Sequence, residues 1–99
     1  MVKHIILWKL KDELTDEEKI AAKNEAKKRL EGLNGRIDGL VSLRVVIDTL
    51  PSSNADMMLD SVFTDNTSLD GYQKNPIHLE AAGYVRSVVS TRLCLDFED

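Results

Sequence analysis

Tyr72 and His78 are the two residues whose side chains and spacing best suit acid–base chemistry. His78, Ala82 and Val85 stand four and three residues apart, so on a helix the imidazole shares the stripe that faces the rest of the protein. Pro76 is expected to kink the helix and to bring Tyr72 beside that stripe. An imidazole with an ordinary pKa of about 6.5 can take a proton, and a phenol can donate to a developing oxyanion. The alternative is a core tyrosine and histidine bonded to backbone carbonyls, and spacing alone favours it.

Four further residues are expected to line a cavity beside this pair. His4, Ile6 and Trp8 alternate in the first apolar run and therefore share one face of a strand. Asn75, which directly precedes the expected kink, is the fourth. Each also has an ordinary structural interpretation, since a lone histidine or tryptophan in an apolar run is more often part of a core. The sequence thus predicts a ligand pocket in which the tyrosine–histidine pair supplies the candidate catalytic residues.

No metal site or cofactor is predicted. The two histidines are far apart, and Cys94 is the single cysteine, so a usable set of zinc ligands does not emerge and no intrachain disulfide can form. Cys94 alternates with Ser90 and Arg92 and is expected to be an inert small residue. A chain with one cysteine, and with no apolar run near the about 20 residues that span a bilayer, fits a cytoplasmic protein.

The charge distribution makes nucleic acids and membranes poor partners. The formal net charge is −4, and residues 37–99 carry ten of the 17 acidic residues but only four of the 13 basic ones. The candidate pair of Tyr72 and His78 lies in this acidic part, and an acidic surface repels phosphate backbones and anionic lipids.

The first two elements follow from apolar periodicity and a capping signal. Residues 2–10 are predicted to form a strand buried on both sides, because both alternate sets contain apolar side chains. Thr15 and Glu18 match a capping box, which predicts that a helix starts there. The predicted apolar stripe of this helix comprises Ala22, Ala26, Leu30 and Leu33, with Ile20 beside it.

Three more strands and a broken helix complete the chain. Residues 40–48, 57–64 and 87–97 are predicted strands, and in the first of them Val41, Leu43, Val45 and Ile47 share one face. Residues 65–67 supply capping side chains for a short helix, and Asn75 followed by proline breaks it and starts another.

This order predicts a single α+β domain, residues 1–99, because chains usually divide only beyond about 250 residues. Strand, helix, strand, strand, helix, strand is the ferredoxin-like βαββαβ arrangement, a four-stranded antiparallel sheet with its helices on one face. The other face keeps apolar side chains without cover. A second copy of the chain related by a two-fold axis is the economical cover, so a homodimer is expected.

Several segments together are similar to a known family. Residues 2–5 (VKHI), the helix entry at Leu14–Thr15, residues 72–78 (YQKNPIH) and the closing residues 95–97 (LDF) resemble the stress-responsive A/B barrel domain (Dabb) family. The resemblance implies a dimeric α+β barrel. It also implies, from a plant polyketide cyclase of the family, cofactor-free acid–base roles for Tyr72 and His78 and a pocket role for His4. The family commonly has His-Pro-x-His where this chain has Asn75 as the first residue, which removes one ionisable group.

Three functional hypotheses remain open. The first is a stress-responsive, homodimeric protein that binds a small apolar or aromatic molecule between helices and sheet. The second is a cofactor-independent enzyme, similar to a polyketide cyclase or a monooxygenase, in which His78 removes a proton alpha to a carbonyl and Tyr72 stabilises the enolate. The third is a purely structural dimer or larger assembly with a solid core.

Overall fold

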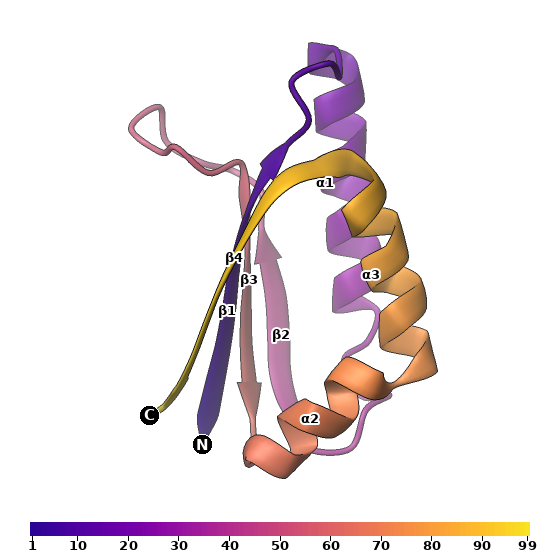
Figure 1. Ribbon diagram of the computed structural model, residues 1–99, viewed down its shortest axis with the longest axis vertical. Helices are drawn as coiled ribbons and strands as arrows, with labels where there is room; N and C mark the ends of the chain where they lie inside the picture. The colour runs from indigo at the N-terminus through magenta and orange to yellow at the C-terminus, as the bar shows by residue number, and fades with distance from the viewer.

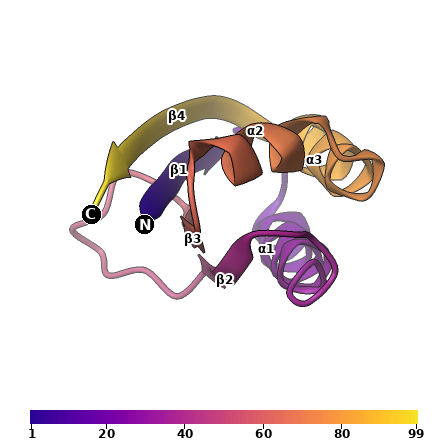
Figure 2. The same cartoon turned by 90° about the horizontal axis from the view of Figure 1, so that it is seen from below.

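The computed structural model describes residues 1–99 as one antiparallel sheet with three helices on a single face (Figure 1). The elements run in the order β1 (Val2–Leu10), α1 (Asp16–Glu31), β2 (Leu40–Val46), β3 (Met57–Phe63), α2 (Asn66–Lys74), α3 (Pro76–Val88) and β4 (Val89–Glu98). The strand order across the sheet is β2-β3-β1-β4, and Figure 2 shows the helices on the same side of it from below. The predicted ferredoxin-like βαββαβ fold is confirmed. None of the helices is both long and apolar enough to cross a bilayer.

The central strand β1 is buried mainly on the side that faces the helices. Its residues alternate between buried and more accessible positions, and His4, Ile6 and Trp8 are at most 5% exposed. On the opposite side Leu7 is 37% exposed and Lys9 is exposed. Within a single copy of the chain, the predicted burial on both sides is therefore wrong for this face, because no helix covers it.

Helix α1 begins as predicted. Thr15 is the N-cap, its side chain accepts a hydrogen bond from the Glu18 amide, and the Glu18 carboxylate accepts one from the Thr15 amide. The predicted stripe residues Ala22, Ala26, Leu30 and Leu33 are all buried, but α1 ends at Glu31, so Leu33 lies in the turn that follows the helix. Ile20 is 61% exposed, which corrects the expectation that it lies beside the stripe.

The helical segment after β3 is broken in two, as predicted. Asp65 caps α2 by accepting a hydrogen bond from the Ser68 amide. Asn75 has an extended backbone, ends α2, and caps α3 through a 3.0 Å hydrogen bond from the Ile77 amide to its side chain. Pro76 is the first residue of α3, where it has no amide hydrogen to leave unpaired. Helix α3 continues to Val88, so β4 begins two residues later than predicted.

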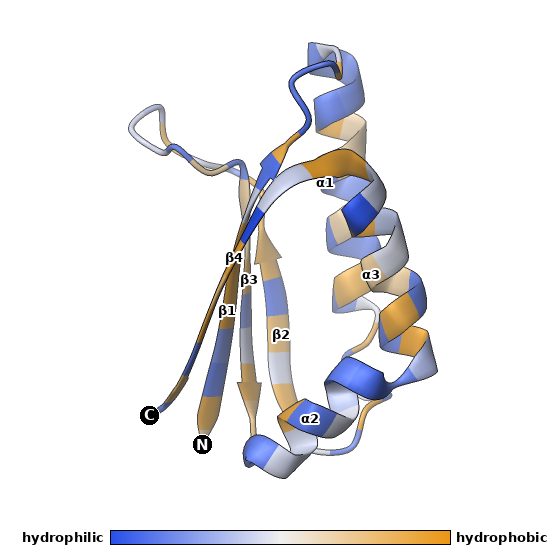
Figure 3. Cartoon of the chain, viewed as in Figure 1, coloured by the Kyte–Doolittle hydropathy of each residue, from blue (hydrophilic) through white to orange (hydrophobic).

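The face of the sheet away from the helices carries uncovered apolar side chains. Strand pairing places Leu93, Leu7, Met58 and Val46 in one row across all four strands. Other exposed apolar residues on this face of the sheet include Leu95 and Phe97 on β4. Figure 3 shows the strands alternating between hydrophobic and hydrophilic residues, as expected for a sheet whose two faces differ.

Strand β2 departs from simple alternation at its start. Leu43 and Val45 are buried and Ile47 is partly buried, but Val41 is 51% exposed. The pairing with β3 shifts register between Leu40 and Ser42, and such an irregularity breaks the alternation on which the prediction for Val41 depended.

Candidate functional site

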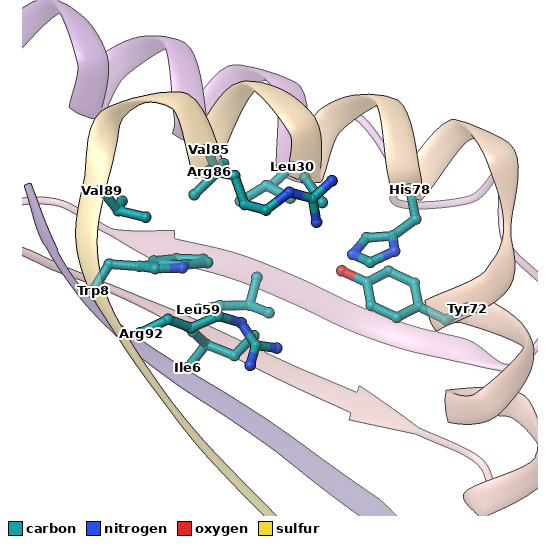
Figure 4. A pocket seen from close by; sticks show the side chains of 11 residues that line it. Ile6, Trp8, Leu30, Leu59, Tyr72, His78, Val85, Arg86, Val89 and Arg92 are labelled. Carbon is teal, nitrogen blue, oxygen red and sulfur yellow. The ribbon is translucent and has the colours of Figure 1, made fainter.

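A cavity of about 320 Å³ lies between the helices and the sheet, near the turn from α3 into β4 (Figure 4). Most of its lining is apolar. The lining residues are Ile6, Trp8, Leu30, Leu59, Tyr72, His78, Ala82, Val85, Arg86, Val89 and Arg92. They come from β1, α1, β3, α2, α3 and β4, so the cavity forms only when the whole domain is folded.

Tyr72 and His78 meet at one end of this cavity, brought together across the break between α2 and α3. Their ring centroids are 3.9 Å apart with an angle of 34° between the planes. Tyr72 is 1% exposed, and its hydroxyl points into the space that Figure 4 shows. Burial raises the pKa of the Tyr72 phenol well above its ordinary value. The phenol is therefore protonated at neutral pH and can donate a hydrogen bond.

His78 has a buried Nδ1 with no hydrogen-bond partner within the protein. Burial, foremost, lowers the pKa of His78 to about 4. Electrostatic interaction with His4 and the guanidinium groups of Arg86 and Arg92 also lowers the pKa of His78, whereas the nearby backbone of Gln73 raises it. The imidazole is therefore neutral at pH 7. A buried polar atom without a partner is uncommon in proteins, and a bound molecule can supply that partner.

Two arginines contribute positive charge to the lining, Arg86 from α3 and Arg92 from β4. Neither makes a salt bridge with an acidic side chain. Neither arginine was among the site residues predicted from the sequence. A signal was available, since Arg86 follows His78 by eight residues, about two helical turns, and Arg92 alternates with Cys94.

Four of the six site residues predicted from the sequence lie together in the structure. Ile6, Trp8, Tyr72 and His78 line the cavity, whereas His4 and Asn75 do not.

The two residues outside the lining have other surroundings. The His4 ring lies edge-on to Tyr72, with centroids 6.1 Å apart, and its Nδ1 hydrogen-bonds to the Asp96 carboxylate. Asn75 caps α3 and borders a different surface hollow.

The chain is similar to one protein family and to several solved structures. The family model described as Stress responsive A/B Barrel Domain matches residues 2–99. A dimeric protein of unknown function with a ferredoxin-like fold from Bacteroides fragilis is 30% identical, with a TM-score of 0.92, over 99% of this chain and 95% of that chain. No curated protein matches the chain.

Two proteins with enzymatic descriptions share the fold at lower identity. A putative antibiotic biosynthesis monooxygenase from Nitrosomonas europaea is 12% identical, with a TM-score of 0.77, over 100% of this chain and 98% of that chain. A hydroxynitrile lyase from Passiflora edulis is 16% identical, with a TM-score of 0.73, over 97% of this chain and 90% of that chain.

Proposed function

Because this chain belongs to the stress-responsive A/B barrel domain family, we propose that it works as a cytoplasmic homodimer whose cavity binds a small apolar or aromatic molecule. The observation that carries this proposal is the combination of an apolar lining with polar groups that have no partner in the protein. The Tyr72 hydroxyl points into the cavity, and the buried Nδ1 of His78 is unsatisfied. A ligand with one polar atom between the two rings would satisfy the imidazole, and its apolar part would pack against Trp8 and Ile6.

The size and charge of the cavity narrow the ligand class. A volume of about 320 Å³ is at the lower end of the range for small-molecule sites, which suits a molecule of one or two rings. Arg86 and Arg92 make no salt bridge within the chain, and a guanidinium binds a carboxylate well. The best fit is therefore an aromatic or apolar molecule with an acidic group.

The homodimer is proposed to form through the sheet face that the helices leave bare. The apolar row that contains Leu7 and Leu93 lies there, together with Leu95, which is 62% exposed. An extended apolar patch on a protein surface commonly marks an interface. The similar protein from Bacteroides fragilis is described as dimeric, which supports self-association of this chain. The cavity is on the other side of the sheet and stays accessible in such a dimer.

Trp8 makes ligand binding directly measurable. It is the single tryptophan of the chain and it lines the cavity, so a ligand should change its fluorescence. The probes are 2-naphthoate and its neutral analogue 2-naphthamide, which share one ring system. We expect saturable quenching by both. We expect about tenfold tighter binding of the acid, because a charge-assisted hydrogen bond contributes roughly 1.5 kcal/mol.

Matched variants locate the binding. Arg92→Gln should remove most of the preference for the acid, whereas Arg36→Gln, a change at an exposed arginine outside this cavity, should keep it. No change in Trp8 fluorescence with either probe would contradict the proposal, and would favour a purely structural dimer.

A cofactor-independent enzyme is the second candidate, favoured by the stacked phenol and imidazole. His78 would take a proton from the carbon next to a carbonyl, the C–H electron pair would form an enolate, and the Tyr72 hydroxyl would donate a hydrogen bond to its oxygen. The substrate would be a polyketide-like or aromatic carbonyl compound. A putative antibiotic biosynthesis monooxygenase and a hydroxynitrile lyase share the fold. However, a base whose pKa is about 4 is poorly matched to proton abstraction at neutral pH, so we rank binding first.

Exchange of deuterium into an aromatic methyl ketone such as 2-acetylnaphthalene tests the second candidate. Catalysed exchange that His78→Ala abolishes, with the circular dichroism spectrum unchanged, would support catalysis. Exchange at the same rate in the wild type and in His78→Ala would rule out His78 as the base.

A further inference from the structure

A second group of polar side chains lies beside the cavity, on the helix-facing side of β1 and β4. His4 Nδ1 hydrogen-bonds to the carboxylate of Asp96. Cys94 Sγ lies 3.8 Å from His4 Nδ1 and 3.5 Å from Asp96 Oδ1. The three donor atoms all fall within 4.8 Å of one another. We propose that His4, Cys94 and Asp96 form a binding site for a divalent transition-metal ion of the zinc type.

Strand pairing explains why these residues converge although up to 92 positions separate them in the sequence. In the antiparallel pairing of β1 with β4, His4 is opposite Asp96 and Ile6 is opposite Cys94. Alternate residues of a strand point to the same face, so the two β4 side chains lie next to each other and next to the imidazole.

The histidine is held in place before any ion arrives. Its side chain is 2% exposed, and its ring packs edge-on against Phe63 and Tyr72, with centroid distances of 6.3 and 6.1 Å. Packing on two sides fixes the orientation of the imidazole, and a ligand that is already oriented loses little conformational entropy on binding.

The donor separations suit a tetrahedral ion. With bonds of about 2.3 Å to sulfur and about 2.0 to 2.2 Å to nitrogen and oxygen, ligand atoms in such a site are roughly 3.5 Å apart. The two distances from Cys94 Sγ agree with this value. His4 and Asp96 are in direct hydrogen-bond contact, so the ion would replace the proton between them. The Asp96 side chain is 39% exposed and has room to turn outward.

One nitrogen, one sulfur and one oxygen donor favour Zn²⁺ or Co²⁺ over Mg²⁺ and Ca²⁺, which prefer oxygen ligands. Three protein ligands leave the fourth position for water or for a bound molecule. The ion can reach the site from solvent, because Asp96 also borders a hollow of about 240 Å³ formed with α2. The proposed dimer face is on the opposite side of the sheet and leaves this route free.

Titration of the reduced, intact protein with Co²⁺ tests the site, because cobalt–thiolate bonds absorb in the near ultraviolet and tetrahedral Co²⁺ absorbs strongly in the visible. We expect saturation at one Co²⁺ per chain and displacement of Co²⁺ by Zn²⁺. Cys94→Ser should lose the near-ultraviolet band. Asp96→Asn should bind Co²⁺ more weakly by at least the roughly 10- to 100-fold that loss of an outer-shell partner of a metal ligand costs. Asp70→Asn, a change at another acid of the same hollow, should bind like the wild type.

Three results would overturn the proposal. The first is the absence of a cobalt–thiolate band in the wild type. The second is binding to Asp96→Asn as tight as to the wild type, which would mean that the thiol alone attracts the ion. The third is that Asp70→Asn weakens Co²⁺ binding as much as Asp96→Asn does. Cys94 and Asp96 are both exposed, so their variants are expected to fold. The circular dichroism spectrum of each variant verifies the fold, so this test does not depend on ligand binding in the cavity.

Discussion

His78 links the electrostatics of the cavity to the stability of the protein. Its pKa falls from about 6.5 in the unfolded chain to about 4 in the folded one. Between these values the unfolded state binds a proton that the folded state does not, so the stabilising contribution is present above pH 6.5 and is lost as the pH falls toward 4. We predict that His78→Gln loses less stability than the wild type between pH 7 and 4, as measured by urea unfolding. If the free energy of unfolding falls equally with pH in the two proteins, the lowered pKa of His78 is not the cause of the pH dependence.

Spacing was sufficient to find some site residues and insufficient for others. The interval between Tyr72 and His78, with a proline between them, was enough to expect that their side chains meet. The grouping of His4 with Asp96 depends on strand pairing between the two ends of the chain, and no local pattern encodes that register. Contacts that depend on pairing between distant strands are therefore the part of a site that is hardest to predict from a single sequence.

At the scale of elements, the junction between α2 and α3 positions the site. Asn75 caps α3 three residues before His78, so loss of the cap should loosen the first turn of α3 and the imidazole with it. We predict that Asn75→Ala lowers the free energy of unfolding by about 1 kcal/mol and weakens 2-naphthoate binding. Asn75→Asp should retain the wild-type free energy of unfolding and the wild-type affinity for 2-naphthoate, since aspartate also caps well. If the two substitutions have equal effects in urea unfolding and in Trp8 titrations, loss of the cap is not the cause of the lower stability and weaker binding.

Elements with local signals were predicted more accurately than those shaped by packing. The capping box at Thr15 and the asparagine–proline junction are encoded within a few residues, and both were found. The exposure of Val41 and Ile20 was not predicted. Val41 is exposed because the pairing of β2 with β3 shifts register, and Ile20 lies outside the face of α1 that packs on the sheet; tertiary contacts decide both. The last strand was predicted to begin two residues before the observed start of β4, because Val88 and Val89 suit either a helix or a strand.

At the scale of the whole molecule, the uncovered sheet face makes dimerisation testable by substitution. Leu95 is 62% exposed on that face, and a buried charge opposite a second copy would be costly. We predict that the wild type sediments as a dimer at micromolar concentration and that Leu95→Glu shifts it toward the monomer. Leu79→Glu is the control, because Leu79 is 45% exposed on α3, away from the sheet. A wild type that sediments as a stable monomer would exclude the proposed dimer.

The fold itself was predictable because length, element order and the apolar residues left on the second sheet face agree with one another. The cavity was expected only in outline. Its existence and volume depend on how side chains from six elements fill the space between helices and sheet, which no periodicity in the sequence describes.

The most direct test of the proposed ligand site is an imidazole NMR titration with 2-naphthoate. The chain has two histidines, so the His78 resonances can be assigned by comparison with His78→Gln. Binding in the cavity predicts a saturable shift of the His78 resonances, with a midpoint at a lower concentration than for 2-naphthamide. His78 resonances that stay unchanged at saturating concentrations of both probes would contradict the proposed function.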